Sequence, residues 1–197
     1  MRIGLDLDNT LVAYDGLFVR VARDLKLPVA NATGKSEVRA ALRARAGGEL
    51  LWRRLQAQVY GPRMREAPAY AGALEFVTTC LAEGHELFVV SHKTRLAAAD
   101  DSVDLHQAAL GWLNARGFGE LERSGRVFFE ATRRAKLERI EQLRLDCFVD
   151  DLAEVLDDPS FPVGTNRYWF SPWSSQRAPA NARRVASFAE LRRAWIG

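Results

Sequence analysis

Two carboxylates, Asp6 and Asp8, stand one residue apart at the end of a short apolar run near the start of the chain. The segment 2–7 (RIGLDL) has the composition of a strand and runs into a turn at residues 8–10. Because side chains alternate along a strand, the two carboxylates are predicted to face the same side. Taking an unpaired carboxylate out of water costs roughly several kcal/mol, so a compensating partner is expected beside them.

Two later segments have the same design, an apolar strand followed at once by polar residues. The strand predicted at 85–90 (HELFVV) ends at Ser91-His92-Lys93-Thr94, and the strand predicted at 146–149 (DCFV) ends at Asp150-Asp151. In an open parallel α/β sheet, ligands bind outside the carboxyl ends of the strands. The three strand ends are therefore predicted to deliver their polar groups to one edge of the sheet.

Four carboxylates at one edge would repel one another unless a cation lies among them. The four are Asp6, Asp8, Asp150 and Asp151. Hard oxygen ligands that leave room for water and phosphate favour Mg²⁺. The sequence therefore predicts a magnesium site at this edge.

The elements that must position these groups alternate between helix and strand. Helices are predicted at about 71–84, 105–116, 132–143 and 182–195, and further strands at 126–129 and 166–170. Apolar strands separated by helices indicate an α/β fold, in which helices cover both faces of a parallel sheet in three layers. Residues 171–182 are the most loop-like segment.

Residues 15–67 lack a clear strand and contain three amphipathic helical patterns. They are predicted to form a small helical cap inserted after the first strand, into a core made of residues 1–14 and 68–197. A cap in this place would lie directly above the polar edge of the sheet.

Composition narrows the classes of protein. The chain has 197 residues, 48% of them hydrophobic, and a formal net charge of +3, values typical of a globular domain. No apolar run reaches the roughly 18 residues of a membrane helix, and the first residues lack the layout of a signal peptide, so a cytoplasmic location without membrane contact is expected. Arginine is dispersed, which does not favour nucleic-acid binding. Cys80 and Cys147 lie in apolar stretches and are predicted to be buried, reduced thiols.

The motifs resemble those of the haloacid dehalogenase (HAD) superfamily, in its phosphatase branch. Asp6-Leu7-Asp8-Asn9-Thr10 is similar to the DxDxT motif, and Ser91 ends a strand as the second motif does. Lys136, on a helix ahead of the last acidic strand, resembles the lysine of the family, and FVDDL (148–152) is similar to the fourth motif. The resemblance covers the core, whereas the insert is similar to the family only in being a small cap.

This resemblance implies a Rossmann-like, HAD-like core and a Mg²⁺-dependent hydrolysis of a small phosphorylated metabolite. Asp6 would be the nucleophile that forms an aspartyl-phosphate, and Asp8 would protonate the leaving oxygen and later activate water. A dehalogenase attacks carbon and expels halide, so it needs no acid at the position of Asp8. The presence of Asp8 therefore favours phosphoryl transfer.

The resemblance also implies binding roles. The phosphoryl oxygens would be held by Ser91 and Lys136, and Thr10 and His92 complete this group, with Thr10 steadying the turn. Lys93 is a rival of Lys136 for the anchoring role. The metal would be held by Asp6, by the main-chain carbonyl of Asp8, and by Asp150 and Asp151, of which either can be the direct ligand.

Other functions on the same core stay open. They are a phosphotransferase or mutase, a phosphatase acting on nucleic-acid ends, and a regulatory module that keeps the fold without turnover. Substrate and oligomeric state are not determined by the sequence.

Overall fold

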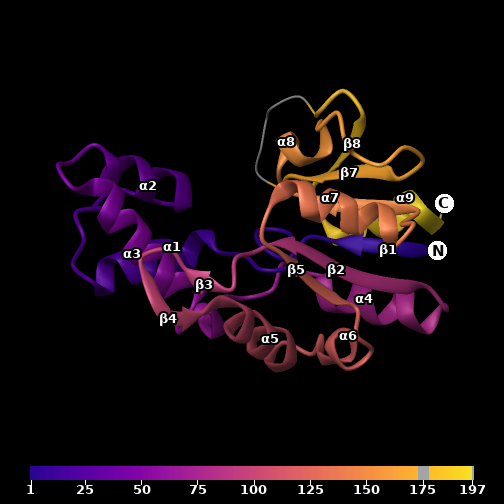
Figure 1. Ribbon diagram of the computed structural model, residues 1–197, viewed down its shortest axis with the longest axis horizontal. Coiled ribbons are helices and arrows are strands. Elements are labelled where there is room, and N and C mark those ends of the chain that lie inside the picture. Colours follow the sequence, from indigo (N-terminus) through magenta and orange to yellow (C-terminus); the bar gives the residue numbers. More distant parts are fainter. Residues whose placement is uncertain (173–177, 197) are drawn as a thin grey trace.

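A six-stranded sheet forms the centre of the protein (Figure 1). The computed structural model describes residues 1–172 and 178–196. Strand order is β5-β2-β1-β6-β7-β8, and every neighbouring pair is parallel. The strands are β1 (Arg2–Leu5), β2 (Glu86–His92), β5 (Val127–Glu130), β6 (Cys147–Asp150), β7 (Asn166–Phe170) and β8 (Ala182–Val185). This architecture confirms the predicted parallel α/β core.

The central strands are apolar on both faces because helices cover both. Along β2, Leu87 and Val89 contribute to one hydrophobic core, while Phe88 and Val90 contribute to another on the opposite face. The first core includes residues of α4 (Ala73–Ala82), α5 (Leu105–Ala115), α6 (Gly119–Arg123) and α9 (Phe188–Ile196); the second includes residues of α7 (Arg133–Gln142) and α8 (Ala153–Leu156). The result is the expected three-layer arrangement.

Helices fill the chain between β1 and α4. They are α1 (Asp15–Asp24), α2 (Lys35–Arg43), α3 (Gly48–Tyr60) and the short 3₁₀ helix η1 (Met64–Glu66). Phe18 of α1 stacks on Trp52 of α3 with ring centroids 5.1 Å apart, and both rings belong to the same hydrophobic core as Leu5 of β1. The two ends of this segment meet where Ala13 N–H donates to the carbonyl of Pro68 (2.9 Å). Figure 1 shows α1–α3 beyond the carboxyl end of β1, to one side of the sheet.

A small antiparallel hairpin, β3 (Leu96–Ala97) and β4 (Asp100–Asp104), follows β2 and was not predicted from the sequence. Ala97 packs with Ala57 of α3 and with Leu105 in a separate small core. The hairpin therefore joins the helical segment to the sheet. Its strands are too short and too polar to give an alternating pattern, which explains why periodicity missed them.

The helix predicted at 182–195 is wrong in its first part. Residues 182–185 form β8, which pairs with β7, and α9 begins only at Phe188. Ala and Arg are good helix formers, but pairing with β7 overrides this weak local preference. A capping box marks the true start: Ser187 Oγ accepts from Glu190 N–H (3.1 Å), and the Glu190 carboxylate accepts from Ala186 N–H (2.7 Å). The predicted loop at 171–182 includes residues 173–177, which lie outside the described residues.

Both cysteines are buried free thiols, as predicted. Burial raises the pKa of Cys80 to about 11 and that of Cys147 to about 12. The helices in the described part of the chain include none with the length and apolar character needed to span a membrane.

We predict that Gly4→Ala lowers the free energy of unfolding by about 1–3 kcal/mol, because the central strand has no room for a methyl group. A Cβ at this position would lie 2.4 Å from Leu145 Cδ1 and 2.5 Å from the ring of Phe148. Urea denaturation measures the change. Gly16→Ala is the control, since a Cβ there meets no atom within 4 Å; equal stabilities of the two variants would contradict the prediction.

Candidate functional site

The register of the sheet brings the first and last acidic motifs together. Leu5 of β1 is paired with Val149 of β6, so Asp6 and Asp150 follow at the same level. The Asp6 N–H donates to the carbonyl of Val149 (2.9 Å) and extends the pairing by one residue beyond β1. Parallel strands thus align residues that are far apart in the sequence.

The loop after Asp6 is closed by its own backbone. The N–H groups of Leu11 and Val12 both donate to the carbonyl of Leu7 at 3.0 Å. Asn9 has a φ of 60°, a left-handed conformation that asparagine tolerates better than most residues. This tight turn carries Asp8 away from the direction of β1, so the two aspartates do not simply continue a strand.

Three carboxylates cluster at the strand ends. Asp6, Asp150 and Asp151 each offer an oxygen, and these oxygens lie within 4.8 Å of one another. Lys136 Nζ donates to Asp6 Oδ1 and to Asp150 Oδ2, both at 2.6 Å. One ammonium group can compensate only part of the charge of three carboxylates, so the cluster is net negative whenever all three are ionised.

Helix α7 determines where Lys136 lies. Its N-cap is Thr132, whose hydroxyl accepts from the Ala135 N–H (3.1 Å), and Lys136 follows one turn later. The side chain is 2% exposed and fixed between the two carboxylates. Burial alone would lower the pKa of Lys136, but attraction to Asp150 and Asp6 raises it above its usual value, so the ammonium stays charged.

The acidic cluster shifts the titration of its members. Burial raises the pKa of Asp6 to about 7, since the cost of desolvation, with repulsion from Asp150 and Asp8, outweighs the attraction of Lys136. Burial also raises the pKa of Asp151 well above its usual value, and repulsion from Asp150 and Asp6 adds to this effect. A divalent cation would relieve both penalties.

Asp8 belongs to a different set of contacts, and its carboxylate is not part of the three-carboxylate cluster. Lys93 Nζ lies 2.8 Å from Asp8 Oδ2 and 3.1 Å from Oδ1. The Tyr14 hydroxyl donates to Asp8 Oδ1 (2.9 Å). The two lysines thus have different partners: Lys136 is paired with the cluster, and Lys93 is paired with Asp8.

The other predicted phosphate ligands are placed unequally. Ser91 is buried at the end of β2 and lines a cavity with Asp6, Asp8, Asp151 and Lys136. His92 is exposed, lines the same cavity, and its Nε2–H donates to the carbonyl of Ala131 (3.1 Å). Thr10 is fully buried and is not among the lining residues, so its expected contact with phosphate is not supported by this geometry.

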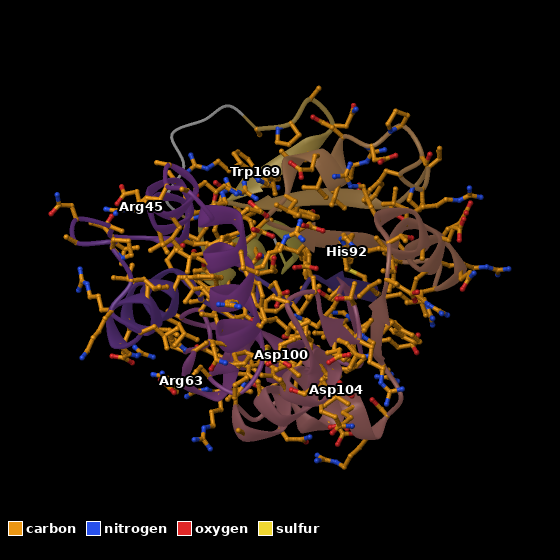
Figure 2. The ribbon with its side chains drawn as sticks, turned by 60° about the vertical axis from the view of Figure 1, so that its left-hand side comes forward. Arg45, Arg63, His92, Asp100, Asp104 and Trp169 are labelled. Atoms are coloured by element: carbon orange, nitrogen blue, oxygen red, sulfur yellow. The ribbon has the colours of Figure 1, made fainter. Side chains whose placement is uncertain are left out.

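The cavity has a volume of about 430 Å³ and lies between the strand ends and the α1–α3 segment. The wall formed by the inserted segment includes Lys35, Arg53, Gln56 and Tyr60. The β3–β4 hairpin closes one side with Ala97. Figure 2 shows His92 above the hairpin residues Asp100 and Asp104 in that view. Sequence reasoning did not find these wall residues.

One sequence signal could have pointed to some of them. Of the 28 basic residues only four are lysines, at positions 26, 35, 93 and 136. Three of the four, Lys35, Lys93 and Lys136, line the cavity. Lysine carries a compact point charge that can meet several oxygens. Of the arginines in the described residues, only Arg53 lines this cavity.

No family model matches the chain, and no curated protein matches it. Several solved structures are similar to it. A HAD family hydrolase from Deinococcus radiodurans R1, with bound phosphate and sodium, is similar with a TM-score of 0.61 at 17% identity, over 98% of this chain and 94% of that one. YfnB from Bacillus subtilis, a HAD-type protein bound to magnesium, is similar with a TM-score of 0.60 at 16% identity, over 98% and 97%. A HAD phosphatase from Thermococcus onnurineus has a TM-score of 0.55 at 14% identity, over 98% and 97%. The chain therefore has the HAD fold.

The raised pKa of Asp6 predicts a pH dependence of stability in the metal-free protein. Between the usual carboxyl pKa of 3.8 and about 7, the folded state keeps a proton on Asp6 that the unfolded state has lost. Stability from this group therefore falls as pH rises through that window and is constant above it.

Asp6→Asn removes this dependence. We expect the difference in melting temperature, variant minus wild type, to increase from about pH 5 to about pH 7.5 when both proteins are measured in chelator. Asp157→Asn, at an exposed carboxylate outside the cluster, is the control. An equal difference at both pH values would contradict the shifted titration.

Proposed function

We propose that the protein is a phosphohydrolase of the HAD superfamily, with residues 15–67 as its cap, that hydrolyses a small phosphate monoester. The observation that carries this proposal is the group of Asp6, Asp150 and Asp151 around one edge of the sheet, with Lys136 buried among them. The HAD fold and the order of the motifs agree with it. The bound phosphate and the metal ions, sodium and magnesium, named for similar structures point the same way.

The donor set fits a hard divalent cation. All three groups offer carboxylate oxygens, and Lys136 neutralises only part of their charge. We assign Asp6, Asp151 and the main-chain carbonyl of Asp8 as the groups that would hold Mg²⁺. Asp150 would bind the ion directly or through a water molecule. When bound, the ion supplies charge neutralisation between the carboxylates and an anionic phosphoryl group.

Asp6 is the proposed nucleophile. Its Oδ1 is paired with Lys136, and none of the described residues donates to its Oδ2. In the first step a bond forms between this oxygen and phosphorus while the bond from phosphorus to the leaving oxygen breaks. The pairing with Lys136 keeps the carboxylate oriented towards the cavity.

Asp8 is the proposed acid and base. It transfers a proton to the leaving oxygen, and in the second step it accepts a proton from the water that attacks the aspartyl-phosphate and releases inorganic phosphate. Lys93 and Tyr14 hold its carboxylate from two sides. Tyr14 is the last core residue before the inserted segment and the N-cap of α1, so the position of Asp8 depends on the junction between the two parts of the chain.

The phosphoryl oxygens would be bound by Lys136 and by the hydroxyl of Ser91, with His92 at the exposed side. Thr10 keeps the turn after Asp8 and makes no contact with substrate in this proposal. The volume of the cavity suits a small metabolite.

We predict that the protein releases phosphate from p-nitrophenyl phosphate in the presence of Mg²⁺ and that Asp6→Asn lowers kcat by about 10³-fold or more. Removal of the attacking oxygen causes this loss. Chelation abolishes the activity, and added Mg²⁺ restores it. The rate is measured from nitrophenolate absorbance.

Asp157→Asn serves as the matched control and retains activity, because this carboxylate is exposed and outside the cluster. If Asp6→Asn, shown by a thermal scan to be folded, hydrolysed the substrate at the wild-type rate, Asp6 would be excluded as the nucleophile. Transfer of the phosphoryl group to an added alcohol, seen as a phosphorylated product instead of free phosphate, would indicate a phosphotransferase.

A second prediction concerns Lys93. Lys93→Met removes the ammonium that holds Asp8, so we expect kcat on p-nitrophenyl phosphate to fall about 10-fold or more, with a smaller change in KM. Lys93→Arg restores part of kcat because it keeps the charge. A rise in KM at unchanged kcat would instead make Lys93 a ligand of the phosphate.

A further inference from the structure

We propose that the inserted segment binds a second anionic group of the substrate, on the leaving-group side, and that Lys35 supplies the cation. This inference rests on the proposed phosphohydrolase and leaves its phosphoryl end unchanged. It narrows the substrate class to small phosphate monoesters whose leaving group carries a carboxylate.

Lys35 differs from the other lysines of the cavity in its partners. Lys136 is paired with Asp6 and Asp150, and Lys93 with Asp8. Among the ion pairs of residues 1–172 and 178–196, none includes Lys35. Its ammonium group lies over the rings of Phe18 (5.6 Å) and Tyr60 (5.7 Å), both in the inserted segment.

These aromatic contacts hold the ammonium without using its hydrogen-bond capacity on a carboxylate. An ammonium group has three N–H donors, and ring faces attract it by their quadrupole alone. The backbone N–H of Lys35 donates to Asp15 Oδ1 (3.1 Å), which fixes the beginning of α2. The Tyr60 side chain is also a hydrogen-bonding partner of the ammonium, and Asp151 and Asp8 attract it from a greater distance without an ion pair. Because an ammonium has three donors, Lys35 is a positioned cation on the cavity wall with donors left for a ligand.

The ring of Tyr60 shows which end of the substrate Lys35 would meet. Lys93 Nζ lies 5.1 Å from the centroid of this ring and Lys35 Nζ lies 5.7 Å from it, so the two ammonium groups are neighbours of one side chain. Lys93 holds Asp8, which donates to the leaving oxygen in the proposed reaction. Lys35 accordingly lies on the same side of the cavity as Lys93, which is the leaving-group side in the proposed reaction, whereas Lys136 and Ser91 belong to the phosphoryl end.

The scarcity of lysine supports the assignment independently. In a chain whose basic residues are nearly all arginine, three of four lysines line this cavity. Arg53 lies on the same wall, but it is half exposed and bonded to Glu49 (3.2 Å). The lysine, and not the arginine, is the cation that a ligand would neutralise.

Two matched pairs of substrates test the inference. Glycerol 3-phosphate and 3-phosphoglycerate differ only in a distal hydroxymethyl or carboxylate group, as do 2-hydroxyethyl phosphate and phosphoglycolate. We expect Lys35→Met to lower kcat/KM on the carboxylate member of at least one pair about 10-fold more than on its neutral member. Lys35→Arg, which keeps the charge, restores part of the preference. Phosphate release is the readout.

Arg39→Met is the charge control, because Arg39 is an exposed residue of the same helix outside the cavity and should leave both preferences unchanged. An equal loss on the neutral and charged members would assign Lys35 to the phosphoryl group, and no loss would make it a packing residue; either result overturns the inference.

A binding measurement separates this inference from the proposed chemistry. Asp6→Asn, in which turnover is blocked, is titrated calorimetrically with the same four compounds, alone and combined with Lys35→Met. Tighter binding of a carboxylate member that disappears with Lys35→Met supports the anion site even if no phosphate is released by the wild type. Equal affinity within both pairs excludes the site whether or not the wild type is a phosphatase.

Discussion

The buried contact of Lys136 with Asp6 and Asp150 is the interaction on which the rest of the site depends. Each carboxylate is nearly inaccessible to water. Burying such a charge without a partner costs roughly several kcal/mol. The ammonium group meets both oxygens at 2.6 Å, which requires α7 to pack against the sheet with its first turn at the strand ends. One lysine cannot balance three carboxylates, however. Without a cation, the repulsion among the carboxylates and their burial raise the pKa values of Asp6 and Asp151, and this cost of ionising all three is the physical reason to propose a divalent cation.

Asp6 and Asp8 are neighbours in the sequence but have different surroundings in the structure. Asp6 lies in the acidic cluster, where burial raises its pKa, while Asp8 is held by Lys93 and Tyr14. The closed turn around Asn9 separates them. Placing two carboxylates in unlike environments is how a protein assigns unlike chemical roles to the same residue type.

The helical segment after β1 and the β3–β4 hairpin complete the cavity that the strand ends begin. Tyr60 connects the two parts, since its ring contacts Lys93 of the core and Lys35 of the insert. The small side chains of Ala57 and Ala97 leave room beside it. The inserted segment, which carries none of the motifs, thus forms the wall that would contact the leaving group of a substrate.

The sequence by itself determined which polar residues lie at the strand ends. Residues 6, 91 and 150 each follow an apolar strand, and parallel strands of one sheet end at the same edge, so their convergence needed only strand periodicity and strand direction. Lys136 was predicted as well, but only through the resemblance to the HAD superfamily, whose lysine has a similar place ahead of the last acidic strand.

Tertiary structure decided the rest. Arg183 and Arg184 lie in a strand because β7 offers a free edge, and local preference alone favours a helix there. The pairing of Lys93 with Asp8 and the place of Lys35 over two rings depend on how the insert and hairpin pack onto the sheet. Periodicity reports which face of an element is buried, but it carries no information on which distant side chain will stand opposite a charge. That information exists only once the chain has folded.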